Sequence, residues 1–199
     1  MEQKPTSPAG RRRLSTYDLA IAGIFGALAI VLSFTPLGMI PVPNPTESAT
    51  TLHLPAIVAG VLSGPIVGGL VGLVLAISSW YRYSAVFVFF SGGNLLVALL
   101  AAFLPRLLIG VLAYYAYRPL RRRPALAAGV AGLVGTLTNT FGVMGALFLL
   151  GNAGEVKPLL LPTFSMNVPI EIAAALIVTI PVVAALRAVG GGRIAAARD

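Results

Sequence analysis

The sequence predicts an all-α, polytopic membrane protein. We expect a six-helix transmembrane bundle with a short second/third helix hairpin and with both termini in the cytoplasm. Of the 199 residues, 57% are hydrophobic and only 10% are charged, and the mean hydropathy is +0.92. A soluble domain carries about 25% charged residues. At roughly 20 residues a span, this length allows about six spans and leaves no room for a separate soluble domain.

The apolar stretches give the order of the elements. We expect a cytoplasmic tail over 1–13, a transmembrane domain over 14–190 and a second cytoplasmic tail over 191–199. Basic residues before an apolar run also suit a signal peptide, but the first run exceeds the 7–15 residues of a signal core. The expected helices cover 17–36, 53–62, 66–79, 94–117, 124–150 and 164–186.

The second and third helices are expected to form a hairpin. Ser63, Gly64 and Pro65 are typical of a tight turn, and each flanking apolar piece is short for a span. The remaining connections are expected to be loops, over 37–52 with its prolines, 80–91 with its aromatic residues, and 151–162 with its glycines and charges. A single broken helix over 53–79 is the alternative.

The positions of Lys and Arg test this order. Cytoplasmic segments attract basic residues in membrane proteins. With six spans, the cytoplasmic segments contain Lys4, Arg11, Arg12, Arg13, Arg118, Arg121, Arg122, Arg123, Arg187, Arg193 and Arg198, whereas the outer segments contain only Arg82 and Lys157. Merging the second and third helices would separate the basic 118–123 loop from both tails, so the charges favour the hairpin.

Several classes of protein are excluded by what the chain lacks. It has no cysteine and one histidine, so thiolate metal sites and the paired histidines of a zinc protease are absent. The two aspartates, Asp18 and Asp199, are at the cytoplasmic ends, and no phosphate-binding glycine loop with its lysine occurs. No repeated motif indicates a pore, and no basic face alternates with aromatic residues as nucleic-acid binding requires. We therefore expect neither an enzyme nor a channel.

Small residues recur at helical spacing in the first span, at Ala22 and Gly26 and at Gly23 and Ala27. Such faces let helices approach closely in lipid. They indicate either packing inside the bundle or a docking face for another membrane subunit.

Two charged residues lie in the interior of predicted spans, away from the cytoplasmic ends. Arg106 is near the middle of the fourth helix and Glu171 is about two turns into the last. Charges in a bilayer face a partner or a cavity, so these residues form either a structural ion pair or part of a ligand cavity.

A second group of polar residues is expected at the outer ends of the helices. Such convergence is typical of a site for a small polar ligand, although each residue alone also suits a helix cap or an interface contact. Arg82 is the outer arginine best placed to bind a carboxylate, and Trp80 is placed to cover or stack on a ligand. The expected site contains Thr51, His53, Trp80, Arg82, Asn94, Asn139 and Asn167.

Several short motifs, taken in order, resemble the S components of energy-coupling factor transporters, which take up vitamins in bacteria. Besides the small-residue face, they are Ala49-Thr50-Thr51-Leu52-His53-Leu54-Pro55, the 60–72 segment with its Ser63-Gly64-Pro65 turn, Leu104-Pro105-Arg106-Leu107-Leu108-Ile109-Gly110, and Gly135-Thr136-Leu137-Thr138-Asn139-Thr140. The motifs look most like the pantothenate-type branch.

The resemblance implies a substrate-binding subunit in the bacterial cytoplasmic membrane. It implies binding of a small water-soluble vitamin, with pantothenate as the first expectation and a pyrimidine or pyridine vitamin as the alternative. The partners would be a transmembrane coupling subunit, docked on the first helix, and two ATPases, with no cofactor in this chain because ATP is used by the ATPases. A structural or assembly membrane protein is the alternative from another class.

Overall fold

The fold was analysed in a computed structural model, which describes residues 14–189. The expected tails, 1–13 and 191–199, lie outside the described residues. The helices are α1 (Thr16–Phe34), α2 (Leu54–Ser63), α3 (Pro65–Phe90), α4 (Leu95–Tyr117), α5 (Pro124–Leu150), α6 (Ala153–Pro162) and α7 (Val168–Val189), with two strands, β1 (Met39–Pro41) and β2 (Ser48–Thr50).

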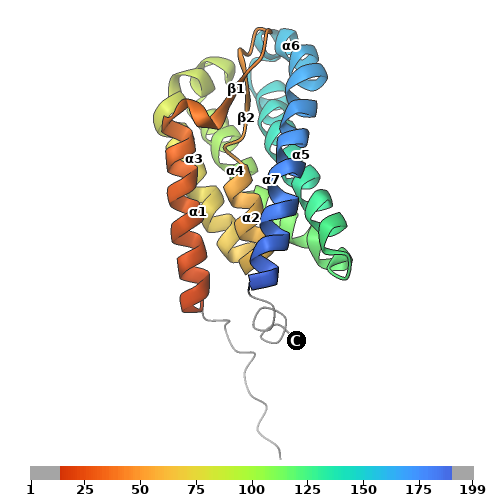
Figure 1. Ribbon diagram of the computed structural model, residues 1–199. Helices are drawn as coiled ribbons and strands as arrows, with labels where there is room; N and C mark the ends of the chain where they lie inside the picture. Colours follow the sequence, from red (N-terminus) through yellow and green to blue (C-terminus); the bar gives the residue numbers. More distant parts are fainter. Residues whose placement is uncertain (1–13, 190–199) are drawn as a thin grey trace, which may run out of the picture.

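The predicted all-α bundle is confirmed. Within residues 14–189, five helical stretches are long and apolar enough to cross a membrane, the last of them running through α6 and α7. The sixth, α2, has ten residues, and all ten are buried. Helix α2 contacts α1, α3, α4, α5 and α7, so it lies at the centre of the bundle. The first residue of α1 and the last of α7 lie at the same end of the bundle (Figure 1).

Two of the expected loops are wrong. Residues 80–90 continue α3, which has 26 residues with one non-helical residue at Tyr83, so only the first helix of the hairpin is short. No glycine or proline interrupts this segment before Gly92 and Gly93, whose φ values are +68° and +81°. The aromatic residues belong to the C-terminal part of a helix rather than to a loop.

The segment 151–162 is also mostly helical. Its residues form α6, which continues into α7 through a π-helical turn over Thr163–Asn167. A loop was favoured by the glycines and charged residues of this segment, which are Gly151, Gly154, Glu155 and Lys157. Helix α6 also contains Pro158 and Pro162, which lack a backbone donor. The π-turn follows Pro162 directly, and such a local adjustment lets membrane helices accommodate proline.

Glycine residues allow three helices to meet at the centre. A Cβ built on Gly110 of α4 would lie 2.5 Å from Gly68 Cα of α3 and 2.6 Å from the Ala56 carbonyl oxygen of α2. The turn between α2 and α3 uses Gly64 with a φ of +94°, as the motif predicts. The small residues of the 60–72 segment therefore serve internal packing.

The segment between α1 and α2 forms a small antiparallel hairpin. Strand β1 pairs with β2 in the register Met39↔Thr50, Ile40↔Ala49 and Pro41↔Ser48. It lies at the end of the bundle opposite the start of α1, the end that we call outer (Figure 1). Non-helical backbone at this depth is tolerated where protein or a cavity surrounds it. The half-length α2 leaves room for this hairpin beside the outer halves of the long helices.

Candidate ligand cavity

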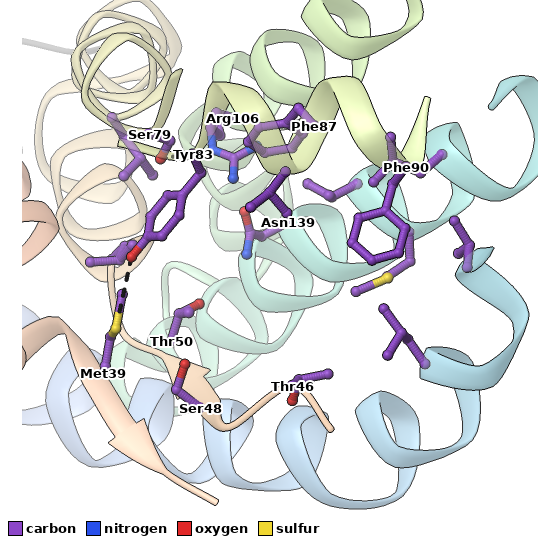
Figure 2. Close-up of a pocket in the computed structure, with 18 of the residues that line it drawn as sticks. Met39, Thr46, Ser48, Thr50, Ser79, Tyr83, Phe87, Phe90, Arg106 and Asn139 are labelled. Atoms are coloured by element: carbon purple, nitrogen blue, oxygen red, sulfur yellow. Dashed lines mark hydrogen bonds between the residues drawn. The ribbon is translucent and has the colours of Figure 1, made fainter. Parts of the chain in front are cut away.

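A cavity of about 400 Å³ lies between the β1–β2 hairpin and the outer halves of α3, α4, α5 and α6. Ligand pockets for small molecules begin at about 300 Å³. Figure 2 shows Tyr83 and Arg106 on one side of the cavity and Ser48 and Thr50 of the hairpin on the other. The lining residues are Met39, Pro45, Thr46, Ser48, Thr50, Leu52, Leu75, Ser79, Tyr83, Val86, Phe87, Phe90, Arg106, Asn139, Val143, Met144, Leu147, Val156 and Leu159.

Arg106 is the charged residue in this lining, and its guanidinium is held on several sides. Nε donates to Ser79 Oγ at 3.3 Å, and Nη1 donates to the carbonyl oxygens of Ala101 at 3.3 Å and Ala102 at 2.9 Å. The Phe87 ring lies 5.1 Å from Cζ, within cation–π range. The described residues provide no hydrogen-bond acceptor for Nη2. A positive group with two free donors thus borders the cavity.

The opposite wall of the cavity is held by Asn167. This buried side chain donates from Nδ2 to Thr46 Oγ1 at 2.7 Å and to the Ser48 carbonyl oxygen at 3.1 Å, and its Oδ1 accepts from Asn44 Nδ2 at 2.7 Å. It comes from the π-turn before α7. Asn167 therefore positions two lining residues without lining the cavity itself.

Glu171 fixes the end of the same wall. Its Oε1 accepts from the Thr50 backbone N–H at 2.8 Å and from Thr50 Oγ1 at 3.2 Å, and its Oε2 accepts from Thr140 Oγ1 at 2.8 Å. The side chain is 4% exposed. Because Thr50 lines the cavity, Glu171 joins the hairpin to α5 and α7 at the site.

Arg106 and Glu171, both among the described residues, do not form the ion pair that was one of the two predicted possibilities. Arg106 binds Ser79 and two carbonyl groups of α4, whereas Glu171 binds Thr50 and Thr140. Arg106 instead has the other predicted position, beside a cavity. Spacing along single helices could not show which way each side chain points.

The remaining residues of the expected site are dispersed. Asn139 lines the cavity. His53 is fully buried at the start of α2, where its Nε2 lies 2.9 Å from Thr136 Oγ1. Thr51 Oγ1 makes a long bond of 3.5 Å to the Leu37 carbonyl oxygen. Asn94 caps α4 by accepting from the N–H groups of Leu96 and Val97, which is the helix-cap alternative.

The two loop residues of the expected site belong to α3 and do not line the cavity. Arg82 is exposed, and its Nε donates to Tyr83 Oη at 2.8 Å. Trp80 packs against Phe87 and Phe103. The helical continuation of α3 places Tyr83 and Phe87, rather than Arg82 and Trp80, toward the cavity.

Several lining residues were missed by sequence reasoning. Ser79 and Tyr83 lie on the face of α3 that also carries Phe87, and this face was not recognised because the segment was read as a loop. Thr46 and Ser48 alternate in the hairpin, and this period of two was the available signal. Thr50 and Thr51 are neighbours in one motif, and nothing in the sequence assigned Thr50 rather than Thr51 to the cavity.

The small residues on α1 divide between two faces. Gly23 and Ala27 are exposed, and Ala22 is partly buried. Gly26 is buried, and a Cβ built on it would lie 3.8 Å from Val74 of α3. The proposed docking face is therefore reduced to Gly23 and Ala27, because Gly26 serves packing inside the bundle.

Five long apolar helices, a buried short helix and a cavity that ends in a polar hairpin define a membrane-embedded solute-binding protein. The chain belongs to the family of ECF transporter, substrate-specific components, whose model matches residues 17–184. It is a multi-pass protein of the cell membrane and a transport component rather than an enzyme, and membership implies association with other components of such a transporter.

The chain is also similar to a curated protein. It is 32% identical over 185 residues to the pantothenic acid transporter PanT of Lactococcus lactis subsp. cremoris (strain MG1363), and the match covers 85% of this chain and 93% of that protein. No solved structure matches the chain significantly.

Proposed function

We propose that this chain is the pantothenate-binding subunit of an energy-coupling factor uptake transporter. The observation that carries the proposal is the Arg106 guanidinium at the cavity, with both donors of Nη2 left without a partner among the described residues. Arginine binds carboxylates through paired, charge-assisted hydrogen bonds. The similarity to a pantothenic acid transporter supports the same ligand.

The rest of the cavity suits the other groups of pantothenate. Asn139, Ser48 and Thr50 offer donors and acceptors for its amide and hydroxyl groups. Val143, Met144, Val156 and Leu159 form an apolar wall from α5 and α6 that can take its two geminal methyl groups. We therefore orient the carboxylate toward Arg106 and the dimethyl end toward α6.

Comparison with pantothenol tests the role of Arg106, because this compound carries an alcohol where pantothenate has its carboxylate. In Arg106→Gln, pantothenate affinity should fall about ten- to hundredfold, the range for a hydrogen bond to a charged group. Pantothenol affinity should change far less. The matched control is Arg122→Gln, which removes an exposed guanidinium that does not line the cavity and should leave pantothenate affinity within about twofold. Isothermal titration of purified protein measures all five affinities: both ligands with the wild type and with Arg106→Gln, and pantothenate with the control.

The results of these titrations test the identity of the ligand and the role of Arg106 separately. Absence of pantothenate binding to the wild-type protein would reject pantothenate, and screening by thermal shift against pyrimidine and pyridine vitamins would then identify the alternative ligand. Equal losses for pantothenate and pantothenol in Arg106→Gln would keep the site but reject the carboxylate clamp.

We further propose that the chain docks on a transmembrane coupling subunit through Gly23 and Ala27 on the outward face of α1. The energy would come from ATP bound by two partner ATPases, and this chain would hold no cofactor. A Cβ built on Gly23 has no atom within 4 Å, so the position is free for a partner. Gly23→Leu should abolish co-purification with the coupling subunit and preserve ligand binding. Gly145→Leu on α5, also at an open position, is the control; retained assembly in Gly23→Leu would reject this face.

A further inference from the structure

Pro105 stands directly before Arg106 inside α4. In an α-helix the N–H of each residue donates to the carbonyl four positions earlier. Proline has no N–H, so the Ala101 carbonyl lacks its ordinary donor. Ala101 is fully buried, and an unpaired carbonyl in a membrane interior is costly. Another donor must therefore serve this oxygen.

The Arg106 guanidinium supplies that donor. Its Nη1 lies 3.3 Å from the Ala101 carbonyl oxygen and 2.9 Å from that of Ala102. Long side chains on a helix point back toward its N-terminus, which brings the guanidinium to the turn that Pro105 has left unpaired. The side chain is thus tied to its own helix.

We propose that Pro105 is a positioning residue that sets the selectivity of the cavity for anionic ligands. This proposal rests on the proposed function, in which Arg106 binds the carboxylate of the ligand. A guanidinium has five N–H donors. The donor on Nε is directed to Ser79, and those on Nη1 are directed to the carbonyl oxygens of Ala101 and Ala102. The two donors on Nη2 therefore remain for the ligand. Pro105 itself does not line the cavity.

The neighbouring helix keeps the proline ring in place. A Cβ built on Gly142 of α5 would lie 2.6 Å from Pro105 Cβ and 2.9 Å from its Cγ. These separations are too short for non-bonded carbons, so only glycine accommodates the ring at this packing. The ring is buried and occupies a fitted space between α4 and α5.

Pro105→Ala is the variant that tests the proposal. It restores a backbone N–H for the Ala101 carbonyl and removes the reason for the guanidinium to stay there. Pantothenate affinity should fall about three- to tenfold, the effect of one ordinary hydrogen bond, while pantothenol affinity stays within about twofold. In an Arg106→Gln background the same substitution should have no further effect on pantothenate, because Pro105 acts through Arg106.

A second measurement does not use the ligand. In protein labelled with ¹⁵N-arginine, slow rotation about the Nε–Cζ bond of a held guanidinium keeps the Nη1 and Nη2 signals apart. The Arg106 signals are those absent from Arg106→Gln. They should be separate in the wild type and averaged in Pro105→Ala. Identical guanidinium spectra in the two proteins, equal losses for pantothenate and pantothenol in Pro105→Ala, or an additive double variant would overturn the proposal. Absence of pantothenate binding to the wild type would reject only the proposed function, because the guanidinium spectra still report whether Pro105 keeps Arg106 on its own helix.

Discussion

Gly110→Ala should destabilise the protein strongly, although alanine is the better helix former. The new methyl group would lie 2.5 Å from Gly68 Cα and 2.6 Å from the Ala56 carbonyl oxygen. Carbon atoms in contact are ordinarily 3.5–4.0 Å apart. Both neighbours are backbone atoms, which cannot rotate away, so α4 would have to move by about 1 Å from α2 and α3.

The magnitude follows from two opposing terms. Overpacking a well-packed core costs about 1–3 kcal/mol and occasionally more, and contacts on two sides place this site at the upper end. The helix propensity of alanine returns at most about 1 kcal/mol. We expect a net loss of about 2 kcal/mol, or roughly 4–8 °C in Tm for a chain of this size.

Thermal unfolding in detergent measures this loss, with Gly23→Ala as the matched control. A Cβ at position 23 meets no atom within 4 Å, so only the propensity gain remains and Tm should stay constant or rise. If Gly110→Ala melts within about 1 °C of the wild type, α2, α3 and α4 are not packed as closely as the structure describes.

Three further variants test residues around the cavity. Glu171→Ala removes the acceptor of the Thr50 N–H and should lower the free energy of unfolding by about 2–4 kcal/mol and weaken ligand binding; Glu171→Gln should do less, and an unaltered Tm for the alanine variant would contradict the role of this bond. Thr136→Val leaves His53 Nε2 without its partner and should cost about 1–3 kcal/mol at unchanged ligand affinity, since neither residue lines the cavity; a loss of affinity would argue for a binding role of His53. Asn94→Ala removes a helix cap and should cost about 1 kcal/mol without affecting affinity, as titration alongside thermal unfolding would reveal.

Composition and charge predict the architecture of this chain well, because each helix is apolar enough to be recognised and the basic residues gather in the segments assigned to one side. The helical segments 80–91 and 151–162 could not be predicted in the same way. Aromatic residues, prolines and polar side chains are also common in loops, and only contacts with neighbouring helices decide in favour of a helix. Tyr83 and Phe87 acquire their orientation from that continuation.

The site was predictable by region but hardly by residue. Polar residues at the outer ends of the helices indicated where a cavity would lie, and Asn139 lines it. The choice between Arg82 and Arg106 depended on side-chain direction. Arg82 stays at the exposed surface, where it donates to Tyr83, whereas hydrogen bonds to α4 turn Arg106 to the cavity. The direction of such a side chain is set by tertiary contacts, so no periodic pattern in the sequence indicates it.

The burial of α2 has a consequence for membrane insertion. Its ten residues are too few to cross a bilayer that requires about 20, and all of them are covered by other helices. During synthesis α2 emerges before α3, α4, α5 and α7, four of the five helices that surround it. The cover of α2 is therefore incomplete until the later helices have been inserted. Because Asn167 and Glu171, just before and within α7, hold the hairpin residues that line the cavity, the binding site too is complete only after the last helix has been inserted.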